Sequence, residues 1–431
     1  MKATGKEFDL SEGNLKNIAQ IFSDYGWPYE TNNGGLYSFS LGYLLSWLGP
    51  VNETSDPSDE WDVISPVLNS VVHVQNILFL ERKSYNDNDM IKKAIMEYGA
   101  VASEICMKFS TQYMNQASYY YNGNESRNHA ITIIGWDDNY SKSNFRLTPP
   151  GNGAWIVKNS YGKRWGDSGF GYVSYYDKSL AKLNDHENTF AIIFNDTIRF
   201  NKNYQYDICG KTDYFVTGYN TIYYQNQFTS TGNDVLAAFS TYFNTTTEWE
   251  ADIIVNDVVK LSQNATSLAG YHTIHLKELI PLKLGDVFKI SLKIHNNNGF
   301  ASFPICEKVS SSRCFYTQGV SFFSYDGKNW HDLYDYFVNE SYGHKYSSQV
   351  ACIKAFTTAS KDILNTTIAI TSLNSTNILV SIKDQNNKAV NMGIVNFNVD
   401  GKDYTEKVIN GVANLKVYLK SGNHKIGRAH V

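Results

Sequence analysis

The sequence changes its pattern near residue 194, and this change constrains the fold more than any other feature. Before that point helical and strand-like patterns alternate, with helices predicted over residues 15–22, 41–47 and 89–98. After it, short strand-like runs follow one another, separated by turn signals such as Leu284-Gly285-Asp286. Short strands at regular spacing are typical of a sandwich. We therefore predict an α+β domain followed by all-β sandwich domains.

The same patterns divide the chain into three units. We predict an α+β domain over residues 1–192, a β-sandwich over 195–360, and a smaller β-module over 362–431 that stops short of a complete set of strands. The strands predicted for the second unit cover residues 221–228, 235–243, 252–261, 287–294 and 348–356.

Composition argues against several kinds of partner. The formal net charge is −4 over 431 residues, which speaks against nucleic acid and against a polybasic membrane contact. No apolar run is long enough to span a membrane, which takes about 18 residues. Metal-ligand spacing with Cys, Asp or Glu is absent around six histidines, His73, His186, His272, His275, His331 and His344. We therefore predict no membrane span, no metal and no cofactor.

Four of the five cysteines lie after the change of pattern near residue 194. Cys306 and Cys314 are near enough in sequence to close a short loop, and Cys209 can pair with Cys352. Free buried thiols fit the same spacings, so the sequence leaves both alternatives open.

Two segments carry side chains suited to catalysis. Residues 128–138 (NHAITIIGWDD) place His129 at the start of an apolar strand, and residues 154–175 place Asn159 directly after a second buried strand. An Asn side-chain oxygen can accept a hydrogen bond from one imidazole nitrogen, which leaves the other nitrogen for a thiol. Tyr161 and Trp165 follow closely and are predicted to shield this hydrogen bond from water.

These segments resemble the His and Asn motifs of the papain family of cysteine peptidases. The resemblance implies that His129 is the general base and that Asn159 orients it. The family usually has Asn-Ser-Trp-Gly where this chain has Asn-Ser-Tyr-Gly, so Tyr161 takes the place of an aromatic Trp. Upstream, residues 9–12 (Asp-Leu-Ser-Glu) resemble the family segment that follows the helix bearing the nucleophile.

A Gly-Gly pair upstream of these motifs also fits the family. Asn33-Gly34-Gly35 resembles the loop that lines the substrate cleft, so Gly34 and Gly35 are predicted to bind the substrate backbone. Glycine suits this position because it lets another backbone approach closely.

The nucleophile is missing from this pattern. In the family the catalytic Cys lies roughly 130–150 residues before the His and Asn, which places it at or before Met1. Cys106 lies in a segment that resembles a structural strand of the family, so we interpret it as structural. We therefore expect an N-terminally truncated, inactive fragment whose Cys and signal peptide lie upstream. The alternative is a pseudoenzyme that starts at Met1.

The two β-units also resemble known modules. Residues 195–360 resemble the lectin-like domain that follows papain-like domains in some prokaryotic surface proteins, and residues 362–431 resemble Ig-like repeats of surface adhesins. Trp249 and Trp330 can stack on sugars or fill a sandwich core.

Together these resemblances imply a secreted or cell-surface cysteine endopeptidase that acts on proteins or peptides. Cell-surface glycans are candidate partners of the β-modules. The rival function is a non-catalytic surface adhesin or carbohydrate-binding protein on a papain-like scaffold.

Overall fold

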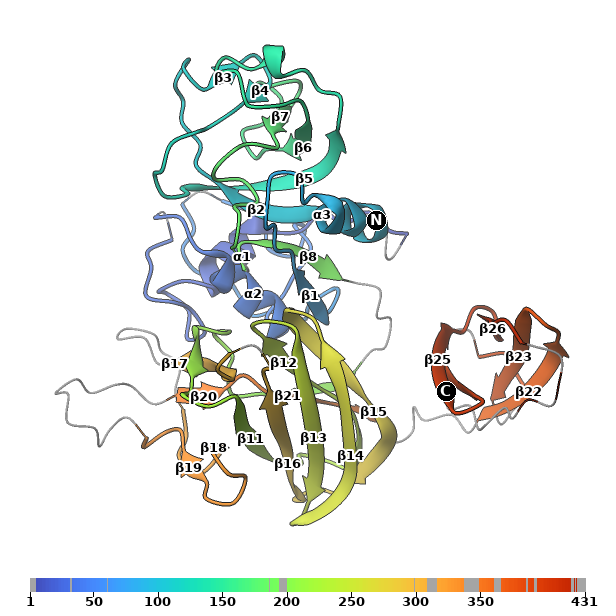
Figure 1. The fold of residues 1–431 in the computed structure, drawn as a ribbon. Helices are drawn as coiled ribbons and strands as arrows, with labels where there is room; N and C mark the ends of the chain where they lie inside the picture. The colour runs from blue at the N-terminus through green and yellow to red at the C-terminus, as the bar shows by residue number, and fades with distance from the viewer. Residues whose placement is uncertain are drawn as a thin grey trace.

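The computed structural model in Figure 1 describes most of the chain. The described residues are 5–31, 33–59, 61–185, 187–193, 200–297, 299–307, 316–336, 349–359, 366–384, 387–390, 394–419, 422 and 424. No helix in this part of the chain is both long and apolar enough to cross a membrane.

The N-terminal part, up to residue 193, combines helices with strands. Its helices are α1 (Glu12–Ile18), α2 (Tyr37–Leu45), α3 (Asp89–Tyr98) and the short 3-10 helix η1 (Lys142–Asn144). Its strands are β1 (Asn76–Phe79), β2 (Val101–Ile105), β3 (Met114–Asn115), β4 (Ser118–Tyr119), β5 (His129–Asp137), β6 (Ala154–Lys158), β7 (Phe170–Ser174) and β8 (Thr189–Ile193).

The three predicted helices are present, but only one of them has the predicted ends. The helix predicted over residues 89–98 is confirmed as α3, which ends at Gly99 with φ +107°. The helices predicted over 15–22 and 41–47 begin earlier, as α1 and α2. At α1 the Ser11 hydroxyl accepts the Asn14 N–H at 2.9 Å. The start of α2 has no side-chain cap, so its position was not visible in the sequence.

Among the described residues from 200 to 359, all regular elements are strands. These are β9 (Lys202–Tyr204), β10 (Asp213–Val216), β11 (Thr221–Thr229), β12 (Asp234–Phe243), β13 (Thr247–Val255), β14 (Val258–Ser267), β15 (Gly270–Leu282), β16 (Val287–His295), β17 (Ser302–Glu307), β18 (Ser321–Ser324), β19 (His331–Asp332), β20 (Gln349–Ala351) and β21 (Lys354–Ala359). A six-stranded sheet runs in the order β14-β13-β16-β11-β18-β19. The predicted succession of an α+β part and an all-β part is therefore confirmed.

Two predicted strands are wrong. The run over residues 348–356 is divided between β20 and β21, which belong to different sheets. The run over residues 252–261 is not continuous but belongs to the β13–β14 hairpin. Asn256 and Asp257 both have positive φ, 49° and 60°, and form its two-residue turn. Asn and Asp tolerate this left-handed conformation, which matches the twist of the flanking strands. The β-branched residues on both sides concealed this turn.

A single sheet joins the N-terminal part to the all-β part. Its twelve strands run in the order β3-β4-β7-β6-β5-β2-β8-β1-β15-β12-β21-β9, and β1 pairs with β15 at the junction (Figure 1). Leu78 lies opposite Gly270, where a Cβ atom would come within 2.1 Å of the Ile77 carbonyl oxygen. The two parts are therefore packed as closely as strands within one domain.

The hydrophobic core also crosses this junction. One buried cluster combines side chains before residue 193 with side chains after residue 200. Its fully or nearly fully buried members are Leu41, Leu45, Val74, Ile77, Phe79, Phe190, Cys209, Tyr242, Tyr271, Cys306, Tyr316, Val350 and Cys352. Burying this apolar surface stabilises the pair of domains as a unit.

The described residues from 366 onward form a separate small β-module (Figure 1). Its strands are β22 (Thr366–Leu373), β23 (Asn377–Asp384), β24 (Ile394–Val399), β25 (Lys402–Lys407) and β26 (Val412–Lys416), arranged in a three-stranded and a two-stranded sheet. The module has its own core around Ile378, Val380, Phe397 and Leu415. Its Ig-like character remains a prediction, as do the three domain boundaries.

Candidate active site

His129 is the first residue of β5, and its backbone is held from two sides. In the sheet it lies opposite Ile105 of β2. The preceding residue, Asn128, accepts the Met107 N–H at 2.8 Å and donates to the Met107 carbonyl at 3.2 Å. These contacts fix the start of β5 while the imidazole stays half-exposed. The side chain is thus anchored but accessible.

Asn159 follows β6, the strand next to β5, and is buried. Its Oδ1 atom lies 2.9 Å from His129 Nε2 and also accepts the Ser160 N–H at 2.7 Å. Since an amide oxygen can only accept, Nε2 carries the proton in this arrangement. The Nδ1 atom is then left with a lone pair, as a general base requires.

Tyr161 covers the imidazole. The two rings stack with centroids 4.6 Å apart and planes 17° apart, and the phenol oxygen lies 3.3 Å from Nδ1. Because the rings are nearly parallel, this oxygen approaches Nδ1 from the ring face and not along its lone pair, so the contact is weak. Burial raises the pKa of the Tyr161 phenol.

Two further aromatic side chains lie against Tyr161. Trp165 is 8% exposed and meets Tyr161 edge-on, with ring centroids 6.5 Å apart. Phe109 is 78% exposed and lies 5.4 Å from the Tyr161 ring. Phe109 was missed in the sequence, because a lone aromatic after a strand carries no signal of its neighbours.

Gly34 and Gly35 lie in the exposed loop before α2. Gly34 has φ +75°, and its carbonyl accepts the Gln20 side-chain N–H at 2.8 Å. Two residues after Gly35, the Tyr37 hydroxyl donates to the Ser103 carbonyl of β2 at 2.9 Å. The structure therefore gathers His129, Asn159, Tyr161 and Trp165 in one cluster and ties the glycine loop to the strand beside β5.

An ion-pair cluster lies next to His129 and was not predicted. Arg127 Nε is 3.0 Å from Glu104 Oε2, and the Arg127 guanidinium also pairs with Asp185. Glu104 lies opposite Ala130 in the β2–β5 ladder. Burial raises the pKa of Glu104, although Arg127 opposes this shift. Side chains of adjacent rungs point to opposite faces, so Glu104 lies on the face of the sheet opposite to that of His129.

None of the described cysteines is available as a nucleophile. Cys106 follows Ile105 and is fully buried, and its carbonyl accepts the Tyr119 hydroxyl at 2.6 Å. Cys306 and Cys352 are free and buried, and burial raises the pKa of the Cys306 thiol to about 12. A neutral, buried thiol is inert.

Of the two alternatives left open by the spacings, neither suggested pairing forms, and Cys306 and Cys352 are free buried thiols. Each pairing required one of these two thiols, whereas Cys209 is disulfide-bonded. Cys314 lies outside the described residues. Spacing alone could not decide between these alternatives, because tertiary contacts choose the partner.

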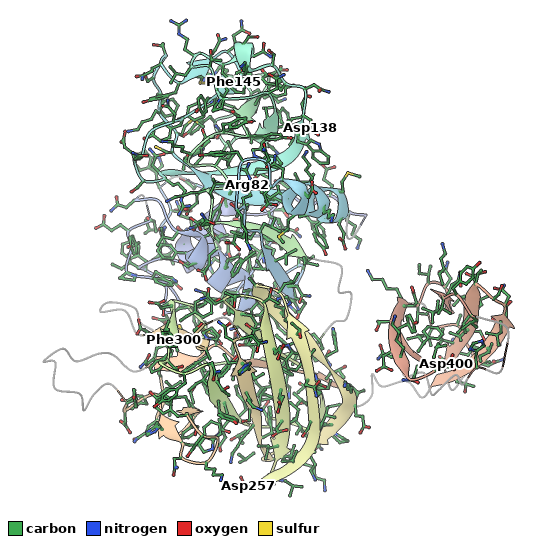
Figure 2. The ribbon with its side chains drawn as sticks, viewed as in Figure 1. Arg82, Asp138, Phe145, Asp257, Phe300 and Asp400 are labelled. Atoms are coloured by element: carbon green, nitrogen blue, oxygen red, sulfur yellow. The ribbon has the colours of Figure 1, made fainter. Side chains whose placement is uncertain are left out.

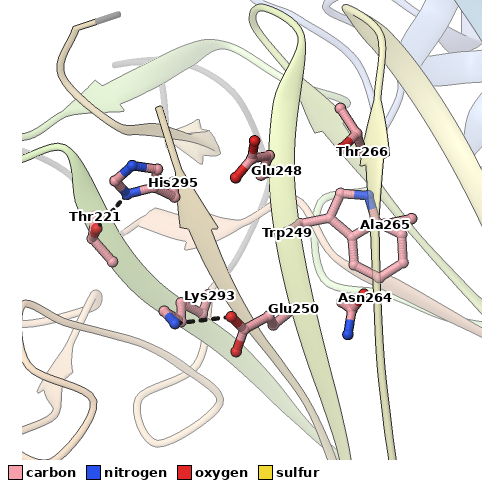
Figure 3. A pocket seen from close by; sticks show the side chains of 9 residues that line it. All are labelled: Thr221, Glu248, Trp249, Glu250, Asn264, Ala265, Thr266, Lys293 and His295. Atoms are coloured by element: carbon pink, nitrogen blue, oxygen red, sulfur yellow. Dashed lines mark hydrogen bonds and ion pairs between the residues drawn. The ribbon is translucent and has the colours of Figure 1, made fainter. Parts of the chain in front are cut away.

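A pocket lies on the all-β part (Figure 3). This pocket of about 430 Å³ is open to the polar face of β11, β13, β14 and β16. On its floor Lys293 pairs with Glu250 at 2.9 Å, and Thr221 bonds to His295 at 2.8 Å. Trp249 is 5% exposed and belongs to the core, whereas Trp330 is partly exposed. Within the described part of the chain, no group of three or more His, Cys, Asp and Glu side chains could hold a metal.

Comparison with known proteins places both parts in families. Residues 1–191 match the papain family of cysteine proteases, and residues 203–357 match the lectin-like domain family. The chain therefore carries a papain-family cysteine peptidase domain joined to a lectin-like domain, which confirms the resemblance and the fold class predicted from the sequence.

Solved structures include the same pair of domains. The cysteine protease and lectin-like domains of Cwp84, a surface-layer-associated protein of Clostridium difficile, match with a TM-score of 0.67 and 25% identity. That match covers 83% of this chain and 80% of the other. A structure of clostridial Cwp84 after propeptide cleavage matches with a TM-score of 0.68 and 24% identity, covering 83% and 90% of the two chains.

Curated relatives match the peptidase part. Mouse pro-cathepsin H is 28% identical over 177 residues, which are 39% of this chain and 47% of that protein. A cathepsin L-like peptidase of Aedes aegypti is 26% identical over 172 residues, which are 39% of this chain and 46% of that protein. The chain thus spans about half the length of the curated relatives it matches.

Proposed function

We propose that this protein is a secreted or cell-surface cysteine endopeptidase whose thiol nucleophile lies upstream of the present chain. The observation that supports this most directly is the 2.9 Å contact of His129 Nε2 with Asn159 Oδ1, beside a half-exposed imidazole. The likeness to a surface-layer-associated protease supports the location.

The proposed mechanism uses His129 as a proton carrier. Nδ1 takes the thiol proton, and the thiolate attacks the carbonyl carbon of the scissile peptide bond. The imidazolium then returns the proton to the leaving amine, and a thioester remains. Water attacks this thioester as Nδ1 removes its proton, which releases the acid and restores the thiol.

The remaining site residues orient these steps. Asn159 holds the Nε2–H tautomer, so that Nδ1 is the nitrogen that exchanges protons with the thiol. Tyr161 and Trp165 keep water away from this hydrogen bond, which strengthens it. The backbone of Gly34 and Gly35 binds the extended substrate peptide.

We propose that residues 1–431 alone are inactive. The support is that the described cysteines are buried or disulfide-bonded. Purified chain is incubated with a fluorogenic peptide library with and without a thiol reagent. We expect no hydrolysis, and hydrolysis blocked by the reagent would overturn this proposal.

The peptidase proposal is tested on a polypeptide extended upstream of Met1. An alkylating active-site label is expected to modify one upstream Cys and to stop peptide hydrolysis. His129→Ala should abolish hydrolysis and slow the labelling, because the thiolate is no longer stabilised. Absence of labelling, with His129→Ala changing nothing, would instead favour the non-catalytic adhesin.

A second candidate function is glycan binding by the lectin-like domain, supported by the polar pocket in Figure 3. Its carboxylates, lysine and histidine lie on alternate rungs, and therefore on one face, of a single sheet, and sugar hydroxyls hydrogen-bond to such groups. Binding is measured on a glycan array with the chain and with Glu250→Gln and Lys293→Met. Glycan binding unaffected by both substitutions, or no binding at all, would remove this pocket as the site.

A further inference from the structure

Helix α2 lies between the peptidase sheet and the lectin-like domain (Figure 1). At its N-terminal end, directly after the Gly34–Gly35 loop, Tyr37 is bonded to Ser103 of the peptidase sheet. At its other end the N–H of the capping residue Ser46 bonds to the Gly42 carbonyl within the helix, whereas its side chain and carbonyl bond across the domain junction. Its hydroxyl donates to the Ile208 carbonyl at 2.7 Å, and its carbonyl accepts the Gln205 side-chain N–H at 2.9 Å. The lectin-like domain thus holds the C-terminal end of α2.

A buried ion pair supports this attachment. Lys354 and Asp207 are both 1% exposed, and Lys354 Nζ lies 2.9 Å from Asp207 Oδ1. The ammonium also donates to Gln205 Oε1 at 2.8 Å and lies 3.4 Å from the Ser46 hydroxyl. A buried charge pair is costly to form, and losing one partner costs still more because the other charge is then buried without compensation. A cation is also favoured at a helix C-terminus.

Backbone packing adds to these polar contacts. Gly42 of α2 lies so close to the turn of the lectin-like domain that a Cβ atom would approach the Cys209 carbonyl oxygen to 2.4 Å. The same carbonyl accepts the indole N–H of Trp27 at 2.9 Å. Trp27 in turn packs on Phe39 of α2, with ring centroids 4.8 Å apart. Contacts of backbone with backbone leave little freedom for α2 to shift.

We infer that Lys354, Asp207 and Gln205 of the lectin-like domain are positioning residues for the substrate-binding loop of the peptidase, acting through α2. The lectin-like domain is then not a detachable module but sets where the Gly34–Gly35 backbone meets the substrate. This inference rests on the proposed substrate-binding role of that loop, and its structural test does not require catalysis.

The test compares amide hydrogen exchange in residues 33–45 among variants of the whole chain. Lys354→Met should raise exchange there on the order of tenfold, because one charged hydrogen-bonding partner is lost. Lys354→Arg should retain slow exchange. The matched control is Lys289→Met, which removes an exposed ion pair with Asp257, at the far end of the lectin-like domain (Figure 2).

A second variant separates positioning from general stability. Replacing both partners, Lys354→Met with Asp207→Asn, removes the unpaired charge and should restore much of the melting temperature, while residues 33–45 continue to exchange fast. Ser46→Ala removes only the bonded hydroxyl and should have the same local effect, which covers the case of a Lys354 variant that fails to fold.

The inference is overturned if Ser46→Ala and the double variant leave exchange in residues 33–45 at the wild-type rate. It is also overturned if exchange rises equally in β13 and β16, because the effect is then global. Neither result bears on the peptidase proposal, which fails instead if the upstream-extended protein shows no thiol-dependent hydrolysis.

Discussion

The imidazole of His129 is held by two different side chains, with Asn159 Oδ1 2.9 Å from Nε2 and the Tyr161 ring stacked on its face. The Asn159 contact decides which nitrogen carries the proton. Asn159→Ala should therefore let both neutral tautomers form, whereas wild type holds the Nε2–H form. The ¹⁵N shifts of the His129 ring in this chain report the change. A wild-type tautomer pattern in the alanine variant would contradict the assigned role of Asn159.

The stacked phenol should contribute to stability through its ring and not through its hydroxyl. Tyr161→Ala should lower the free energy of unfolding by about 1 kcal/mol, since aromatic pairs of this kind contribute about that much. Tyr161→Phe keeps the ring and should be close to wild type, because the 3.3 Å contact to Nδ1 is weak. Urea unfolding of both variants tests this. Equal losses in the two variants would show that the hydroxyl matters more than the stacking.

The junction between the two domains depends on the absence of a side chain at Gly270. This residue has φ +142°, and a Cβ would lie 2.1 Å from the Ile77 carbonyl oxygen. Gly270→Ala should cost about 3 kcal/mol, since backbone cannot move aside cheaply. Gly218→Ala is the control, because no atom lies within 4 Å of its Cβ position. Calorimetry should show a lower melting temperature for the first variant alone.

Arg82 holds three backbone carbonyls in the interior of the peptidase domain, near the centre of that part in Figure 2. It is 1% exposed and donates to Tyr85, Tyr175 and Ala181 at 3.0, 3.1 and 3.3 Å. Arg82→Met should cost about 3 kcal/mol, because these acceptors are left buried without donors. The exposed Arg164→Met is the control, and an equal effect of both substitutions on chemical denaturation would argue against this account.

Stability should fall as the pH rises above about 9. Burial raises the pKa of the Cys306 thiol from 9.0 to about 12, and it raises the pKa of the phenols of Tyr214, Tyr242 and Tyr271 well above their ordinary value of 10.0. In this window the unfolded chain has lost protons that the folded chain keeps, so the free energy of unfolding decreases.

One buried group acts in the opposite direction at high pH. Burial lowers the pKa of Arg82 to about 10. Above that pH the unfolded chain binds more protons at this group than the folded chain does, so this group makes the free energy of unfolding rise with pH. The effect of Arg82 on the free energy of unfolding is smaller than the combined opposite effect of the three buried phenols and the Cys306 thiol. The melting temperature from pH 7 to pH 11, with tyrosinate absorbance recorded in parallel, should fall steadily. A constant value up to pH 11 would contradict this prediction.

The sequence by itself determined the class of fold and predicted that His129 and Asn159 form a pair. Alternating helical and strand patterns before residue 194, and strands alone after it, decided the succession of α+β and all-β parts. His129 and Asn159 could be paired because their segments resemble the His and Asn motifs of the papain family, and because each residue sits at the end of an apolar strand. The contact between their side chains is therefore a short-range consequence of two neighbouring strands.

Only the tertiary structure decided how the two domains meet. Nothing local in residues 76–79 or 270–282 shows that β1 pairs with β15, because backbone hydrogen bonds carry no sequence code. The buried Lys354–Asp207 pair joins residues 147 positions apart, and Lys354 reaches Ser46 across 308 positions. The same holds for the free state of Cys306 and Cys352. These features depend on long-range packing, which patterns read over a few residues do not contain.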